Sequence, residues 1–230
     1  MSPSSSRVAA ITAPSQPLPL VRHLSYRASR VLVRTPLTPN QITWTALALG
    51  LAASVALLRG DRGGDLAAAV LLVLCYVLDN CDGEIARAKS LSSTFGAQLD
   101  TAVDAVVHAV FFIALGHAEW RTTGHVTWAV LGWAAAGGAT VNYVIGLVHD
   151  ARARRAPATA VPPPVPDPAP RGWRELAVFA LRELSRADFC FIVVLLAALD
   201  LLHLLLPAAA LGAQAYWLSG LWSRARDFHV

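Results

Sequence analysis

The feature that most constrains this chain is a series of six apolar segments separated by polar breaks. Of the 230 residues, 55% are hydrophobic and only 15% are charged, whereas a soluble domain carries about 25% charged residues. Because roughly 20 apolar residues in an α-helix span a bilayer, we expect an all-α integral membrane protein with six transmembrane helices. The segments cover about residues 41–58, 66–78, 99–115, 127–148, 189–204 and 208–221, with the last two broken near Pro207.

Some of these segments are short, so their helices must continue into the polar residues beside them in order to cross. The second segment is the clearest case, because Asp79, Asn80, Cys81 and Asp82 follow it directly. We therefore expect these polar residues to lie inside a helix and at membrane depth.

The remaining segments indicate how the chain is organised. Residues 1–19 are rich in Ser, Pro and Ala and predict a flexible N-terminal tail. Residues 20–34 combine apolar residues with four arginines, as in a short amphipathic helix on an anionic membrane surface, although an ordinary connecting helix explains the segment equally well. A Pro-rich cytoplasmic linker covers residues 156–171. We treat residues 20–230 as one membrane domain.

The distribution of positive charge predicts the orientation, because cytoplasmic loops carry an excess of Lys and Arg. If both termini are cytoplasmic, all of the 19 Lys and Arg residues except Arg59, Arg62 and Arg121 fall on that side. Topology therefore explains the net charge of +4, and we expect no nucleic-acid partner. The three cysteines form no CxxC pair, so neither a zinc site nor a disulfide framework is indicated.

Four acidic residues stand near the cytoplasmic ends of the second and third segments. Asp79 and Asp82 are three residues apart, and Asp100 and Asp104 are four apart, so each pair shares one helix face. Intramembrane carboxylates mark functional sites, and four converging acids would repel one another without cations between them. Oxygen ligands favour Mg²⁺ or Mn²⁺. Paired ions of this kind suit phosphoryl transfer, with Asp104 placed to act as general base.

Two glycines and an arginine lie between these acids in the sequence. Gly83 and Gly96 lack side chains, which permits a close approach by a ligand or by a neighbouring helix. Arg87 lies four residues beyond Gly83 on the same helix face, where its guanidinium can pair with a phosphate oxygen.

The run Asp79-x2-Asp82-Gly83-x2-Ala86-Arg87-x8-Gly96-x3-Asp100-x3-Asp104 resembles the signature of the CDP-alcohol phosphotransferase family, also called CDP-alcohol phosphatidyltransferases. The resemblance implies six transmembrane helices, a homodimer and a polar cavity that faces the cytoplasm. It also implies that the four aspartates hold two metal ions, with Asp104 as general base. Pro39-Asn40-x2-Thr43 is similar to a family segment near the nucleotide, although Thr38 or Asn40 would also cap a helix there. The implied CDP-binding residues are Gly83, Ala86, Arg87, Gly96, Asn40 and Thr43.

The resemblance also implies a reaction. A phosphatidyl or other substituted phosphate group would pass from a CDP-linked donor, such as CDP-diacylglycerol, to an alcohol, releasing CMP. We expect this chemistry to serve phospholipid synthesis in a bacterial plasma membrane, with membrane lipids as partners. One alternative is a soluble polar acceptor such as an inositol phosphate. An alternative of another class is an ion-coupled transporter that uses the acids as an ion pathway, although no second copy of the acid cluster is present.

The acceptor is left open by the sequence. Arg154, Arg155 and Arg186 are candidates for binding an anionic acceptor, but cytoplasmic loops carry arginines for topology alone. Ala105 stands where family members with phosphorylated acceptors often carry a basic residue, whereas the GEIAR core resembles members that make inositol-phosphate diesters.

Two further features bear on packing. His108 extends the stripe of Asp100 and Asp104 by one turn; it either bonds Asp104 or, more simply, is an ordinary core histidine. The glycines of the fourth segment predict close helix packing rather than ligand binding; they are Gly132, Gly137 and Gly138.

Overall fold

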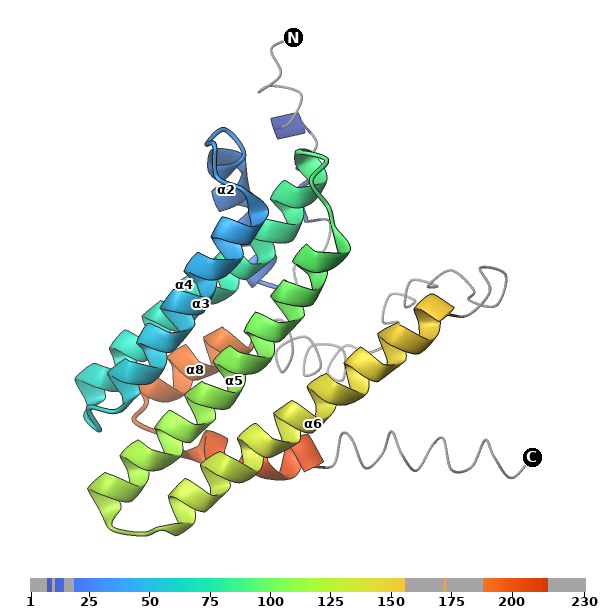
Figure 1. Cartoon of the computed structure of the whole chain (residues 1–230). Coiled ribbons are helices and arrows are strands. Elements are labelled where there is room, and N and C mark those ends of the chain that lie inside the picture. Colours follow the sequence, from blue (N-terminus) through green and yellow to red (C-terminus); the bar gives the residue numbers. More distant parts are fainter. Residues whose placement is uncertain (1–7, 10, 15–18, 156–171, 173–187, 215–230) are drawn as a thin grey trace.

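The computed structural model describes residues 8–9, 11–14, 19–155, 172 and 188–214, and the regular elements in those ranges are all helical (Figure 1). Helix α3 packs against both α4 and α5, α6 packs on α5, and α2 and α8 pack on α4. The elements are α2 Val21–Leu32, α3 Pro39–Leu57, α4 Arg62–Ala88, α5 Thr94–Thr123, α6 Thr127–Arg155, α8 Phe189–Ala198 and the 3₁₀ turn η2 Leu202–Leu204.

Four helices, α3 to α6, are long and apolar enough to cross a bilayer. The second span extends through its polar neighbours as predicted, because α4 has 27 residues and continues through Asp79 and Asp82 to Ala88. At about 1.5 Å per residue, this helix is long enough to cross and still project beyond the apolar core. Helix α5, with 30 residues, likewise begins before Asp100. Both acid pairs therefore lie within regular helices.

The last two apolar segments are divided at a different place from the predicted one. Helix α8 ends at Ala198, and Asp200 has a φ of +61°, a left-handed conformation that does not continue an α-helix. Pro207 lies in the first turn of the α-helix that follows η2, where its missing N–H would have had no partner. The predicted break near Pro207 is therefore wrong.

The apolar helices Phe189–Ala198 and Leu202–Gln214 are both shorter than the roughly 20 residues that cross a bilayer. Residues 173–187 and 215–230, which flank them, lie outside the described residues. The fifth and sixth spans stay predictions, as does the proline-rich linker at 156–171.

Helix α6 makes its closest approaches through glycine. A Cβ atom on Gly132 would lie 2.5 Å from the carbonyl oxygen of Phe112 on α5, and one on Gly138 would lie 2.6 Å from the Cβ of Ala213. Real side chains do not approach so closely, so the close-packing prediction is confirmed at these two positions. A Cβ atom on Gly137 would meet no atom of the described residues within 4 Å, so close packing at Gly137 stays a prediction.

Helix α2 occupies the place of the predicted amphipathic helix and packs on α4 through small side chains. Ser25 and Ser29 are fully buried. The buried carboxylate of Asp188, just before α8, accepts hydrogen bonds from the backbone N–H groups of Leu20 (2.6 Å) and Val21 (2.8 Å). A negative charge at a helix N-terminus is favourable, so Asp188 ties the start of α2 to the bundle. Contact of α2 with a membrane surface stays a prediction.

The segment before α2 also touches the bundle. Ile11, within the predicted N-terminal tail, is only 7% exposed and packs in a cluster with Val33, Ile42 and Ile85. At least this residue of the segment has a fixed apolar environment.

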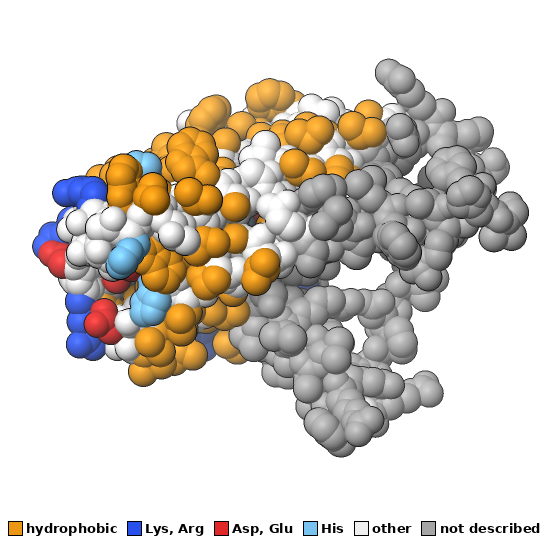
Figure 2. Space-filling model, turned by 90° about the horizontal axis from the view of Figure 1, so that it is seen from below, with side chains coloured by type: hydrophobic (Ala, Val, Ile, Leu, Met, Phe, Trp, Pro, Cys, Tyr) orange, Lys and Arg blue, Asp and Glu red, His pale blue; other side chains and the backbone are white. Residues whose placement is uncertain are grey.

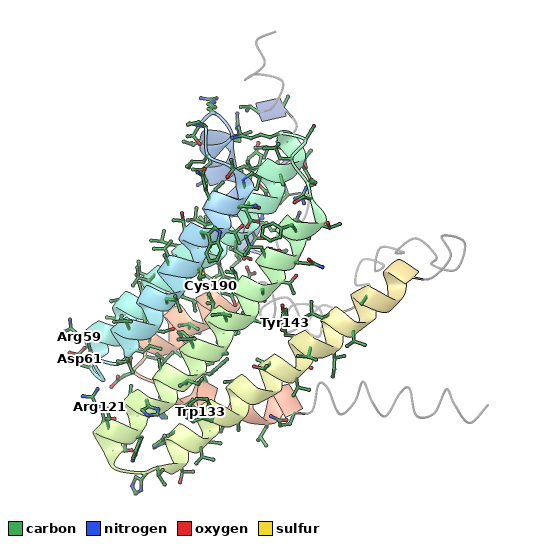
Figure 3. The ribbon with its side chains drawn as sticks, viewed as in Figure 1. Arg59, Asp61, Arg121, Trp133, Tyr143 and Cys190 are labelled. Atoms are coloured by element: carbon green, nitrogen blue, oxygen red, sulfur yellow. The ribbon has the colours of Figure 1, made fainter. Side chains whose placement is uncertain are left out.

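The end of the bundle with the α3–α4 and α5–α6 turns holds the three arginines predicted to lie outside the cytoplasm. Figure 2 views the molecule from this end and shows charged side chains at one edge of a largely hydrophobic surface. Arg59 pairs with Asp61 at 3.1 Å, and Arg121 beside them donates to the Leu58 carbonyl at 3.1 Å (Figure 3). Arg62 donates to the last carbonyl of α8 at 3.0 Å. Arg62 and Arg121 thus provide hydrogen-bond donors for carbonyl groups at the ends of helices.

Candidate active site

Helix α4 ends and α5 begins at the other end of the bundle (Figure 1). Residues of these helix ends line a cavity of about 220 Å³. Its walls come from the start of α3, the last turns of α4, the α4–α5 turn and the first turns of α5. The lining includes all six predicted CDP-binding residues and two of the four acids. The lining residues are Pro39, Asn40, Thr43, Asp82, Gly83, Ala86, Arg87, Leu91, Ser92, Ser93, Gly96, Ala97 and Asp100.

The start of α3 is fixed by a capping box. Thr38 and Gln41 exchange hydrogen bonds, with the Thr38 N–H donating to Gln41 Oε1 at 2.9 Å and the Gln41 N–H donating to Thr38 Oγ1 at 3.4 Å. Thr38 is thus the cap, and Asn40 remains available to the cavity. A Cβ atom on Gly96 would lie 3.4 Å from Asn40 Oδ1, so the first turns of α3 and α5 meet here.

Thr43 lies one turn further along α3 and contacts an acid of the signature. Its hydroxyl donates a hydrogen bond to Asp82 Oδ2, and both side chains are buried. Thr43 therefore holds the Asp82 carboxylate in position. The sequence predicted a nucleotide contact for Thr43 but not this bond, because a partner 39 residues away leaves no local signal.

Arg87 lies over Gly83 at the end of α4. Among the described residues, a Cβ atom on Gly83 would meet only the Arg87 guanidinium, at 3.4 Å from its nearest nitrogen. The missing side chain of Gly83 thus leaves space beside the cavity, and the positively charged Arg87 guanidinium borders this space. This arrangement suits a phosphate oxygen, which guanidinium groups bind well.

Lys89, to which the sequence assigned no role, joins the end of α4 to the loop before α3. Its ammonium donates to the carbonyl oxygens of Thr35 at 2.8 Å and Leu37 at 2.7 Å. This loop leads directly into Pro39 and Asn40 of the cavity wall. Lys89 therefore helps to fix two walls of the cavity relative to each other.

The four predicted acids come from the end of α4 and the start of α5. The carboxyl groups of Asp79 and Asp100 lie close to each other, and the Asp79 carboxyl also lies within electrostatic range of Asp82 and Asp104. Two carboxylates in contact need a proton or a cation between them. Asp79 therefore lies near the other three acids and beside Asp100, while the convergence of all four on shared ions stays a prediction.

The donor chemistry of these acids fits hard divalent cations, which prefer carboxylate oxygens. Among the described residues, however, no three Asp, Glu, His or Cys side chains gather closely enough to hold one ion. The side chains thus bring suitable donors to one place without forming a complete ligand set. The predicted two-metal site stays a prediction.

Asp104 is the most exposed of the four, with a side chain that is 57% exposed. His108 Nδ1 lies 3.1 Å from Asp104 Oδ1 and 2.9 Å from the Asp104 carbonyl oxygen. On its other side, His108 Nε2 lies 2.8 Å from the Tyr76 hydroxyl. His108 thus bonds Asp104, and the simpler interpretation as an ordinary core histidine is wrong. Nothing in the sequence indicated that Tyr76 would bond His108.

The candidate acceptor-binding arginines are not tested by this geometry. Arg154 and Arg155 end helix α6, but their side chains lie outside the described ones, and Arg186 lies outside the described residues. Their role stays a prediction.

Comparison with known proteins decides the family. The model of the CDP-alcohol phosphatidyltransferase family matches residues 36–213, more than three quarters of the chain. The chain belongs to this family. Every residue that lines the cavity falls within the match. Membership of this family favours a transferase of phosphate-containing groups over the transporter alternative.

Individual CDP-alcohol phosphatidyltransferases are similar to parts of the chain. It is 40% identical over 97 residues to a bifunctional IPC transferase and DIPP synthase of Aquifex aeolicus, a match covering 42% of this chain and 21% of the relative. It is 32% identical over 127 residues to an archaetidylinositol phosphate synthase of Pyrococcus horikoshii, covering 54% of this chain and 62% of the relative. The match thus spans about a fifth of the first relative and less than two thirds of the second.

Proposed function

We propose that the protein transfers a phosphatidyl or other substituted phosphate group from a CDP-linked donor to an alcohol and releases CMP. The observation that carries this proposal is the cavity in which Asp82, Asp100 and Arg87 meet the start of α3. Two chain segments far apart in sequence, residues 39–43 and 82–100, contribute to it, and both belong to the family match. Family membership supports the type of chemistry, and the cavity supports the location.

The donor would bind with its pyrophosphate beside Gly83 and Arg87. The guanidinium offers hydrogen-bond donors and positive charge where the glycine leaves space, as a diphosphate requires. Asn40 and Gly96 would approach the nucleotide from α3 and α5. Thr43 would serve indirectly by holding Asp82.

We infer that Asp79, Asp82, Asp100 and Asp104 hold two divalent cations, Mg²⁺ or Mn²⁺, when the donor is bound. Bound ions would neutralise the phosphate charge and stabilise the leaving CMP. The closeness of Asp79 and Asp100 supports this inference, because a cation would relieve the repulsion between their carboxylates.

Asp104 would act as the general base, because its side chain is the most open of the four. In the transfer step the acceptor oxygen forms a bond to phosphorus while the bond from phosphorus to the CMP oxygen breaks. The proton of the acceptor hydroxyl passes to the Asp104 carboxylate.

We propose an inositol phosphate as the first acceptor to test. The relative named archaetidylinositol phosphate synthase supports this choice, as do Arg154 and Arg155 at the end of α6. The cavity lies at the end of the bundle that carries Arg87, Lys89 and the arginines of α2, so the positive-inside rule favours a cytoplasmic site. A homodimer in a bacterial plasma membrane completes the proposal.

The test is CMP release by the purified full chain in lipid nanodiscs with CDP-diacylglycerol and Mg²⁺. We expect release with an inositol phosphate, and weaker or no release with glycerol phosphate, inositol, serine or water alone. EDTA should abolish it, and added Mg²⁺ should restore it. Release with another acceptor would replace the inositol phosphate but keep the reaction, whereas no release with any acceptor would reject the proposal.

A further inference from the structure

His108 connects two helices directly beside the acid cluster. Asp104 and His108 are four residues apart on α5, so their side chains lie on one face. The imidazole contacts Asp104 through Nδ1, at 3.1 Å from Oδ1, and Tyr76 of α4 through Nε2, at 2.8 Å. The ring therefore fills the space between an acid of the signature and the neighbouring helix.

The partners of the ring determine where its proton lies. Both Asp104 atoms near Nδ1, the carbonyl oxygen and the carboxylate oxygen, are acceptors, so Nδ1 must carry the hydrogen. In a neutral imidazole Nε2 is then an acceptor, and the Tyr76 hydroxyl donates to it. All contacts are satisfied by a neutral ring in one tautomer.

Aromatic packing limits the movement of the ring. Phe189, the first residue of α8, lies 5.7 Å from His108 and 6.5 Å from Tyr76 between ring centroids, and Phe111 packs against Phe189 at 6.3 Å. Tyr76 is 7% exposed. The histidine is thus held by buried groups, whereas the carboxylate that it contacts is largely open.

We propose that His108, fixed by Tyr76, is a positioning residue that sets the orientation of the Asp104 carboxylate. The proposal rests on the proposed function, in which Asp104 is the general base. The bond from Nδ1 engages Oδ1 and leaves Oδ2 for the acid cluster and the acceptor hydroxyl. An open aspartate would otherwise sample several rotamers, and only some of them would place an oxygen at the acceptor.

Two substitutions by amide side chains test separately the bond of the ring to Asp104 and its bond to Tyr76. In His108→Asn the amide nitrogen replaces Nδ1 and keeps the bond to Asp104, whereas in His108→Gln it reaches the place of Nε2 and keeps only the bond to Tyr76. Partners that orient a functional group are worth about 10- to 100-fold in activity. We expect His108→Gln to lower kcat at least about tenfold with KM for the CDP donor unchanged, and His108→Asn to stay within about threefold of wild type.

A matched control is His117→Gln, which makes the same change further along α5, away from the cavity. It should leave kcat unchanged. Equal loss of kcat in both His108 variants, together with a lower unfolding temperature, would mean that His108 only supports the fold and would overturn the proposal. Wild-type kcat in His108→Gln would overturn it as well.

A second measurement does not depend on activity. In ¹⁵N-histidine-labelled protein, we expect the signal that disappears in His108→Gln to show hydrogen on Nδ1, which both the neutral Nδ1–H tautomer and an imidazolium carry. The tautomer with hydrogen only on Nε2 would remove the bond to Asp104 and overturn the proposal. A wild-type protein that shows hydrogen on Nδ1 but releases no CMP would count against the proposed function and leave the positioning contact established.

Discussion

The two ends of the bundle use charged residues in different ways. At the end with the α3–α4 turn, Arg62 and Arg121 donate to backbone carbonyls at helix ends, and Arg59 pairs with Asp61. At the other end, acids and Arg87 border a cavity and come from different helices. Charges that complete helix ends stabilise the fold, whereas charges brought together around a cavity require a ligand to balance them.

The largest effect should come from the acid that lines the cavity and lies close to a second acid. We expect Asp100→Asn to reduce CMP release at least about 1000-fold, because it removes a charge from the site of phosphoryl transfer. Divalent-cation binding should weaken in parallel. It can be measured by electron paramagnetic resonance with Mn²⁺ in place of Mg²⁺. Asp61→Asn at the other end is the matched control, and a comparable loss of CMP release there would remove the contrast between the two ends.

Asp104→Asn should have the next largest effect and a different signature. Loss of a general base costs about 10²- to 10⁴-fold in kcat, while the other three acids remain to bind the cation. We therefore expect Mn²⁺ binding to survive better than in Asp100→Asn. Full activity of Asp104→Asn in the CMP assay would show that another group takes the proton.

Replacing Lys89 should have a smaller effect and tests whether the cavity walls must be held together for donor binding. In Lys89→Met the loop before Asn40 loses both carbonyl contacts, so the donor should bind to a less ordered wall. We expect KM for the CDP donor to rise about fivefold, since ordering a segment on binding costs free energy, with kcat changing less. Lys89→Arg should restore much of the donor affinity, and an effect confined to kcat would contradict this role.

The smallest effect should come from the charged end without the cavity. Arg121→Gln removes a charged donor from the Leu58 carbonyl, and an exposed bond of this kind contributes about 1 kcal/mol or less. We expect a slightly lower midpoint of thermal unfolding in detergent and unchanged CMP release per folded molecule. A loss of activity larger than the loss of folded protein would mean that this end takes part in catalysis.

The helices and the acid pairs were predictable because they depend on local spacing. Apolar length predicted the spans of α3 to α6, and separations of three and four residues placed Asp79 with Asp82 and Asp100 with Asp104. The break in the C-terminal apolar region was placed wrongly because Pro207 is a strong local signal. It falls in a first turn, and the actual interruption is at Asp200.

The amino-acid sequence by itself determined the membrane class, the family and the acids and glycines of the signature, because helical periodicity and apolar length act over neighbouring residues. Only the tertiary structure decided that Thr43 holds Asp82, that Lys89 joins two cavity walls and that His108 lies between Tyr76 and Asp104. Most of these contacts join residues tens of positions apart, brought together by helix packing. A buried polar group takes whichever partner the packing supplies, and that choice leaves no periodic trace in the sequence.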